Sequence, residues 1–123
     1  MKKYIDLAPN SAGSTHLKAE VIYNLGGYSY WTGSTEQRGY YLHVSPVKRE
    51  TRDYNGRPVV LESFVAFSGY KQLVKPVTRK SAKAEAEAET LAEAALADLI
   101  RAVCNKNGLQ LAAETATGET SAA

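Results

Sequence analysis

The chain changes character at about residue 81, and this change restricts its fold more than any other feature of the sequence. Alanine and glutamate dominate residues 81–107, and apolar side chains recur at helical spacing between Leu91 and Val103. A helix of this length extends about 40 Å, which matches a strand of about twelve residues. Gly108 fits the left-handed position of a helix stop, with Leu109 packing back on the last turn. The sequence therefore predicts one long C-terminal helix that can cover a sheet.

The residues before this helix have the pattern of β-strands. Every second side chain from Leu17 to Tyr23 belongs to one largely apolar face of an extended chain. After a turn at Gly26 and Gly27, residues 28–32 are aromatic and β-prone. The polar stretch 33–39 is expected to connect them to another strand and so to complete a first hairpin.

The strongest local signal is the dipeptide Asn55-Gly56. A type I′ turn needs positive φ at both central residues, and Asn-Gly tolerates this better than almost any other pair. If the turn is flanked by Tyr54 and Arg57, the opposed residues are chemically matched, and each such pair contributes roughly 0.2 to 1 kcal/mol. The predicted pairs are Arg49 with Glu62, Thr51 with Val60, and Val47 with Phe64.

Two prolines limit the assignment of strands. Pro46 cannot donate a hydrogen bond to a neighbouring strand, so its position is expected at an edge or a bulge. Residues 70–77 fit either a short helical turn or a last strand, and Pro76 limits both.

The length and composition indicate one globular domain. The chain has 123 residues, of which 44% are hydrophobic and 23% charged. We expect an irregular N-terminal arm at residues 1–16, a single domain at 17–109 and a disordered tail at 110–123. The predicted fold class is α+β, with a twisted antiparallel sheet of about four strands packed against one long C-terminal helix.

The sequence favours a cytoplasmic protein. Cys104 is the only cysteine, so no intramolecular disulfide can form. Asp6, Pro9 and Asn10 interrupt what could otherwise begin a signal peptide, and no later stretch is apolar enough to span a membrane.

No pattern in the sequence indicates a catalytic or metal site. His16 and Glu20 lack a third ligand nearby, and His43 has no identifiable nucleophile or orienting partner. Cys104 lies near the apolar stripe of the helix and is expected to behave as a small buried hydrophobe. The glycines follow no phosphate-binding motif. We therefore expect a protein that is not an enzyme and that carries no cofactor or metal.

Charge is distributed unevenly along the chain. Residues 1–83 contain 13 Lys and Arg against 6 Asp and Glu, whereas residues 84–123 contain 2 against 7, which gives net charges of +7 and −5. A basic segment of this kind is consistent with nucleic-acid binding, but complementary faces and solubility would also explain it.

Aromatic and basic residues occur together on the expected strands. The aromatic residues are Tyr28, Tyr30, Trp31, Tyr40 and Tyr41. Exposed rings can stack on bases while Lys and Arg neutralise phosphates, although strand alternation could equally place most of these rings in the core. The candidate residues for binding a nucleic acid or a partner are Tyr30, Trp31, Arg38, Tyr41, Lys48, Arg49, Arg52 and Arg57.

A second basic run leads into the helix. It comprises Lys71, Lys75, Arg79 and Lys80, followed by Lys83. Spacings of three and four would place several of these residues on one face if the segment were helical. A solvated face without a ligand is the alternative.

Three short segments carry a resemblance to known proteins. They are residues 39–47 (Gly-Tyr-Tyr-Leu-His-Val-Ser-Pro-Val), 67–71 (Phe-Ser-Gly-Tyr-Lys) and 79–81 (Arg-Lys-Ser). Over roughly residues 17–109 the chain resembles small uncharacterised proteins from phages and mobile elements of gut Firmicutes. The resemblance implies mobile-element biology, in which small proteins inhibit host defence complexes such as CRISPR nucleases or accompany DNA replication and transfer. It implies no functional residue.

We therefore expect a binding protein of phage or mobile-element origin that engages a nucleic acid or a nucleoprotein complex through a basic, aromatic sheet surface. The alternative is a protein-interaction module that inhibits a host defence complex. An enzyme is the third and weakest hypothesis. A homodimer through a sheet edge or the alanine-rich helix face is left open.

Overall fold

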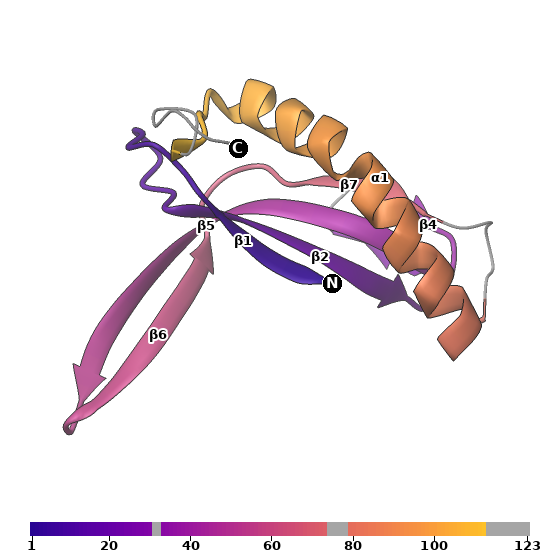
Figure 1. Ribbon diagram of the computed structural model, residues 1–123, viewed down its shortest axis with the longest axis horizontal. Helices are drawn as coiled ribbons and strands as arrows, with labels where there is room; N and C mark the ends of the chain where they lie inside the picture. The colour runs from indigo at the N-terminus through magenta and orange to yellow at the C-terminus, as the bar shows by residue number, and fades with distance from the viewer. Residues whose placement is uncertain (31–32, 74–78, 113–123) are drawn as a thin grey trace.

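A computed structural model describes residues 1–30, 33–73 and 79–112 of the chain (Figure 1). These residues form seven strands and one helix. The elements are β1 (Lys2–Asp6), β2 (His16–Asn24), β3 (Gly27–Ser29), β4 (Ser34–Glu36), β5 (Gly39–Tyr54), β6 (Arg57–Phe64), β7 (Gly69–Gln72) and α1 (Ala82–Asn107).

The fold is α+β, as predicted, with an antiparallel sheet packed against one long C-terminal helix (Figure 1). The sheet has the strand order β1-β2-β5-β6, and β7 also pairs with β5. The apolar face of β2 lies where the alternation from Leu17 to Tyr23 puts it, because Leu17 and Ala19 are fully buried beneath the helix. Residues 70–72, for which strand and helical turn were both open, belong to β7.

The N-terminal segment differs from the expected irregular arm. Within residues 1–16, β1 pairs with β2 in a regular register, from Lys2 opposite Glu20 to Asp6 opposite His16. Lysines and an aspartate in so short a strand conceal its β character, and pairing with β2 rather than local propensity determines its conformation. Near the other end of the chain, Leu111 forms a bridge with Leu7, and the Ala8 N–H donates to the carbonyl of Gln110 at 2.8 Å. Residues 110 and 111, placed by the sequence in a disordered tail, therefore hold a fixed position.

The helix begins and ends where the sequence predicts. Ser81 is the N-cap, and its hydroxyl accepts a hydrogen bond from the Ala84 N–H at 3.1 Å. Gly108 has a φ of 66°, and the Leu109 N–H donates to the carbonyl of Cys104 at 2.9 Å. This geometry satisfies a carbonyl that would otherwise lack a partner at the end of the helix.

The core lies between α1 and the central strands. Leu42 and Val44 of β5 are fully buried, as are Ala88 and Ala92 of the helix. Alanine at these two helical positions allows the helix backbone to come close to the sheet. Val103 completes this layer near the C-terminal end of the helix.

Strand β5 has two halves with different surroundings. Residues 39–47 pair with β2 on one edge, and residues 41–44 pair with β7 on the other. Beyond Val47 the strand pairs with β6 alone among the described residues. We call residues 48–63 the arm; Figure 1 shows it projecting away from the rest of the molecule.

The turn at the tip of the arm confirms the hairpin prediction. Asn55 and Gly56 have φ values of 54° and 80°, the positive values that a type I′ turn requires. All three predicted cross-strand pairs are present, namely Arg49 with Glu62, Thr51 with Val60, and Val47 with Phe64.

Pro46 lies at the boundary between the two halves of β5. Its carbonyl accepts a hydrogen bond from the Val65 N–H at 3.3 Å. On this edge of β5 the partner changes at Pro46 from β7 to β6, and residues 65–68 form the break between those two strands. The proline therefore stands where the pairing on this edge of β5 is interrupted, which agrees with the first of the two expected positions, an edge or a bulge.

The first hairpin differs from the one expected. Strand β3 pairs with β4, which lies inside the stretch that was expected only to connect two strands. The two form a separate two-stranded sheet. Polar residues such as Ser34 and Thr35 give little signal for a strand, so the turn was placed too late in the sequence.

Candidate binding arm

The predicted aromatic residues divide between the surface and the core. Tyr28 and Tyr30 are 60% and 92% exposed, and their rings meet edge to face with centroids 5.1 Å apart. Tyr40 and Tyr41 are buried. Trp31 lies outside the described residues.

The prediction that Tyr41 belongs to a binding surface is wrong. It is 5% exposed, because β5 has neighbours on both edges here and Ile22 and Gln72 lie opposite it in the register. Its hydroxyl donates to the carbonyl of Gln37 at 2.8 Å. This residue therefore packs within the sheet and cannot offer a ring to a ligand.

The basic residues lie apart from the exposed tyrosines. Lys48, Arg49, Arg52 and Arg57 all belong to the arm, whereas Arg38 is exposed just before β5. The hairpin of β3 and β4 precedes the opposite end of β5, a strand whose 16 residues span about 50 Å. Figure 1 shows β4 and the arm at opposite ends of the molecule. The expected single aromatic and basic surface is thus two separate regions.

Strand alternation divides the arm into two faces of different charge. One face, which we call the basic face, carries Lys48, Glu50, Arg52, Tyr54, Arg57, Val59, Leu61 and Ser63. The other, which we call the mixed face, carries Arg49, Thr51, Asp53, Pro58, Val60 and Glu62. Three cations and one carboxylate give the basic face a formal charge of +2, and one cation with two carboxylates gives the mixed face −1. A partner attracted by positive charge would therefore meet one face only.

Arg49 is held in a cluster at the base of the arm. Its guanidinium carbon lies 3.9 Å from the centre of the Tyr4 ring, and its Nε lies 3.4 Å from Glu62 Oε1. Its backbone N–H donates to Thr15 Oγ1 at 2.8 Å. These contacts show that Arg49 joins the arm to the rest of the molecule, which we call the body. Its position differs from the predicted role of a free ligand-binding cation.

Glu62 is the centre of the same cluster. It accepts hydrogen bonds from the Tyr4 hydroxyl at 2.7 Å and from Lys18 Nζ at 2.9 Å. Burial acts to raise the pKa of the Glu62 carboxyl, but these hydrogen bonds and the charges of Lys18 and Arg49 outweigh it, so the pKa lies below its usual value. The hydrogen bond to Glu62 raises the pKa of Tyr4 and, against the effect of burial, that of Lys18. The cluster therefore keeps its charges at neutral pH.

The remaining cations of the arm are available to a ligand. Arg52 pairs with Glu50 at 2.9 Å, but both side chains are well exposed, and such pairs contribute little. Lys48 and Arg57 have no acidic partner among the described residues. Tyr54 and Val59, at 49% and 38% exposure, supply apolar surface beside them.

The second basic run does not form one helical face. Lys71 belongs to β7, and Arg79 and Lys80 precede the first residue of α1. Lys80 Nζ lies 5.9 Å from the centre of the Tyr23 ring. Lys75 lies outside the described residues. Because the helix starts only at Ala82, the spacings of three and four in this run do not place its side chains on one helical face.

The histidines and the cysteine are involved in local contacts. His16 Nε2 lies 3.1 Å from Asp6 Oδ1, and His43 Nδ1 lies 3.1 Å from Ser45 Oγ. Cys104 is buried, and this burial raises the pKa of its thiol, which disfavours the nucleophilic thiolate. Within residues 1–30, 33–73 and 79–112, no three His, Cys, Asp or Glu side chains are grouped as a metal site. No helix of the described chain has the length and apolarity to cross a membrane.

Comparison with known proteins gives no relative, because no family model, curated protein or solved structure matches this chain. The resemblance to phage and mobile-element proteins stays a prediction.

Sequence reasoning missed several residues of this site. Tyr54 and Val59 share the basic face with Arg52 and Arg57, and counting alternate positions outward from the Asn55-Gly56 turn would have found them. Tyr4 and Lys18 at the base of the arm carry no such signal, because their contacts with Glu62 bridge 58 and 44 residues of sequence.

Proposed function

We propose that this chain is a non-enzymatic binding protein that engages nucleic acid, free or within a nucleoprotein complex, through the basic face of its arm. The observation that carries the proposal is the asymmetry of the projecting ribbon. Lys48, Arg52 and Arg57 lie on one face with Tyr54, whereas the opposite face has a net negative formal charge.

The dimensions of the arm suit a nucleic-acid groove. The major groove of B-form DNA is about 12 Å wide and admits a two-stranded β-ribbon. Seven residues of β5 beyond Val47 extend about 23 Å at 3.3 Å per residue. Lys48, Arg52 and Arg57 lie at intervals along this length, where they can neutralise successive phosphates. Alternatively, the exposed ring of Tyr54 can stack on an unpaired base, a contact that contributes about 1–3 kcal/mol.

Fluorescence anisotropy of labelled duplex and single-stranded oligonucleotides at several salt concentrations tests the proposal. Neutralisation of three phosphates on a duplex gives a slope of about −2.7 in log affinity against log salt. The double variant Arg52→Ala with Arg57→Ala is expected to reduce the magnitude of this slope by about 1.8. Tyr54→Ala distinguishes base stacking from groove binding, because it should weaken only the single-stranded complex.

A matched control removes the same charge elsewhere. Lys2 and Arg101 are exposed on β1 and α1, so the double variant Lys2→Ala with Arg101→Ala lowers the net charge equally and leaves the arm intact. The control should retain the parent slope. Equal losses in both double variants would show that net charge, and not the arm, determines binding.

A protein surface is the second candidate partner. Val59 and Val60 are 38% and 51% exposed on opposite faces, and the arm has no further strand partner among the described residues. An apolar interface or strand addition to the arm would use these features. Such binding should depend only weakly on salt, and inhibition of a host defence complex is one activity that it could serve. The salt titration described above therefore separates the two candidates.

A further inference from the structure

Strand β7 pairs along one edge only in the part of the chain that the structure describes. That edge pairs with β5. The Leu73 N–H donates to the carbonyl of Tyr40 at 2.9 Å, which fixes the alternation of backbone groups along the strand. In an antiparallel ladder of this register, the backbone N–H and C=O of Tyr70 and Gln72 point away from β5. An extended chain alongside β7 could therefore pair with both residues.

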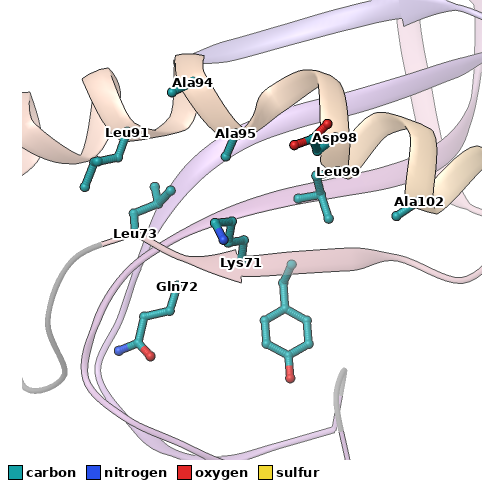
Figure 2. A pocket seen from close by; sticks show the side chains of 10 residues that line it. Lys71, Gln72, Leu73, Leu91, Ala94, Ala95, Asp98, Leu99 and Ala102 are labelled. Atoms are coloured by element: carbon teal, nitrogen blue, oxygen red, sulfur yellow. The ribbon is translucent and has the colours of Figure 1, made fainter.

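An apolar groove lies beside this edge, between β7 and α1. It has a volume of about 530 Å³ and is lined mainly by apolar side chains. Figure 2 shows Leu91 and Leu99 pointing from the helix toward the strand, and Leu73 pointing from the end of β7 toward the helix. Ala94, Ala95 and Ala102 form the helical wall, and their short side chains leave the space open.

The groove narrows toward the start of β7. At Gly69 a methyl group would lie 2.6 Å from Val103 Cγ2, so the helix packs directly on the strand there. A shallower hollow of about 250 Å³ continues past this contact and reaches Lys106. The open space and the free backbone groups thus run along the same strand.

The charges around the groove are unbalanced. Lys71 lines the main groove, and Lys106 lines its continuation. Neither lysine has an acidic partner among the described residues. Asp98 also lines the groove, and its pair with Arg101 at 3.0 Å joins exposed side chains, so the charged lining residues Lys71, Lys106 and Asp98 give a net formal charge of +1. The groove therefore favours a ligand with negative charge.

We propose that this groove is the docking site for an extended, acidic and apolar segment of a partner protein, which adds a strand to β7. The segment pairs its backbone with Tyr70 and Gln72, as in recognition by strand addition, and every second side chain enters the groove. Its carboxylates are on that same side, where they meet Lys71 and Lys106. This site is separate from the arm and does not depend on the function proposed for it.

Labelled octapeptides provide the test, with the full chain and fluorescence anisotropy as the readout. One probe is Val-Ser-Glu-Ser-Val-Ser-Glu-Ser, in which Val and Glu lie on one side of the extended peptide, and a second has Lys in place of Glu. Two surface ion pairs of up to about 1 kcal/mol each should favour the Glu peptide roughly tenfold. The variant Lys71→Glu should bind the Glu peptide more weakly, and the Lys peptide more tightly, than the parent does. Two further versions of the Glu peptide carry N-methyl groups on either the odd-numbered or the even-numbered backbone nitrogens. Only one of the two versions should lose binding, because only one set of N–H groups donates to β7.

Matched tryptophan variants locate the site. Ala94 is exposed and lines the groove, so Ala94→Trp should fill it and reduce peptide binding at least tenfold. Ala86 is also exposed on α1 but does not line the groove. The variant Ala86→Trp should therefore bind the Glu peptide with the affinity of the parent. The arm variant Arg52→Ala with Arg57→Ala should also retain peptide binding, which separates this proposal from that for the arm.

Three results would overturn the proposal. They are the absence of binding of the Glu peptide up to millimolar concentration, equal binding of both peptides, and full binding to Ala94→Trp. Sedimentation tests whether a second copy of the chain occupies the groove instead. If the parent is a dimer and Ala94→Trp is a monomer, the second copy is the occupant, and the assignment to a partner protein is wrong.

Discussion

The two halves of β5 are one continuous strand in two different environments. In the first half, Leu42, Val44 and Val47 are fully buried. In the second half, beyond Val47, Tyr54 is 49% exposed, and Val60 of β6, which lies opposite Thr51, is 51% exposed. The difference follows from the neighbours, since β2, β7 and α1 surround the first half, and β6 is the only described strand that pairs with the second.

This contrast separates stability from recognition. A two-stranded hairpin is at best marginally stable by itself, so the arm depends on its connection to the body. That connection includes the cluster of Tyr4, Lys18, Arg49 and Glu62 at its base. Residues further along the arm bury little surface, so substitutions there can change the binding of a partner with little effect on the stability of the core.

The largest expected effect is in the body half. Leu42→Ala removes a fully buried side chain from the core and should lower the free energy of unfolding by about 3 kcal/mol. Val60→Ala in the arm should lower it by less than about 0.5 kcal/mol, because that side chain is half exposed. Urea denaturation of both variants measures the comparison. Similar losses would mean that the arm contributes to the cooperative core.

The elements beside the two halves of β5, namely β7 and the turn of the arm, should also differ in how they tolerate an added methyl group. Gly69→Ala places its Cβ 2.6 Å from Val103 Cγ2 and 3.1 Å from Leu99 Cδ1. Because these side chains belong to the packed layer, the expected loss in unfolding free energy is about 2 kcal/mol. Gly56→Ala meets open space and only the strain of a φ of 80°, which costs about 1 kcal/mol.

Hydrogen exchange distinguishes the two glycine variants further. Gly56→Ala should accelerate exchange of arm amides and leave those of β2 and the first half of β5 unchanged. Gly69→Ala should accelerate exchange throughout the sheet. A uniform change in the Gly56→Ala variant would indicate that the arm and the body unfold together.

The base of the arm should be sensitive to pH. Because the folded pKa of Glu62 is depressed, its contribution to stability is present above the unfolded pKa of about 4.3 and is lost as the pH falls through the folded value. Glu62→Gln removes this contribution, so its free energy of unfolding at pH 7 should be about 1 kcal/mol below that of the parent. The gap should shrink below about pH 4.

The alkaline side has the opposite sign. The raised pKa values of Tyr4 and Lys18 mean that their protonated forms stabilise the fold below about pH 10, and this stabilisation is lost as the pH rises through the folded values. Urea denaturation from pH 3 to 11 measures both limbs. A gap between parent and Glu62→Gln that does not change with pH would show that the carboxylate does not carry the effect.

The parts of this fold that were predictable from the sequence are those with local signals. The Gly108 stop and the Asn55-Gly56 turn each act within a few residues, and each lies where it was predicted. Strand β1 was missed, because its conformation depends on pairing with β2 across the intervening loop. For the same reason the sequence could not show which tyrosines are exposed.

The arm illustrates this limit within the candidate site itself. Its register was predictable from the turn, and with it the fact that Arg52 and Arg57 lie on one face. That β6 has no further strand neighbour in the described part of the chain, and that Arg49 contacts Tyr4, depends on where β1, β2 and β7 end. Such endings are set by tertiary packing and leave no local pattern.

The smallest expected effect on stability is at Arg52. Its ion pair with Glu50 joins side chains that are 58% and 38% exposed, so Arg52→Ala should change the free energy of unfolding by no more than about 0.3 kcal/mol. The same variant should reduce the magnitude of the salt slope for duplex binding by about 0.9. Urea denaturation and the anisotropy titration measure the two quantities on one preparation. If Arg52→Ala destabilises the chain as much as Glu62→Gln does, the arm is anchored along its whole length, and its residues do not divide into those that hold it and those that recognise a partner.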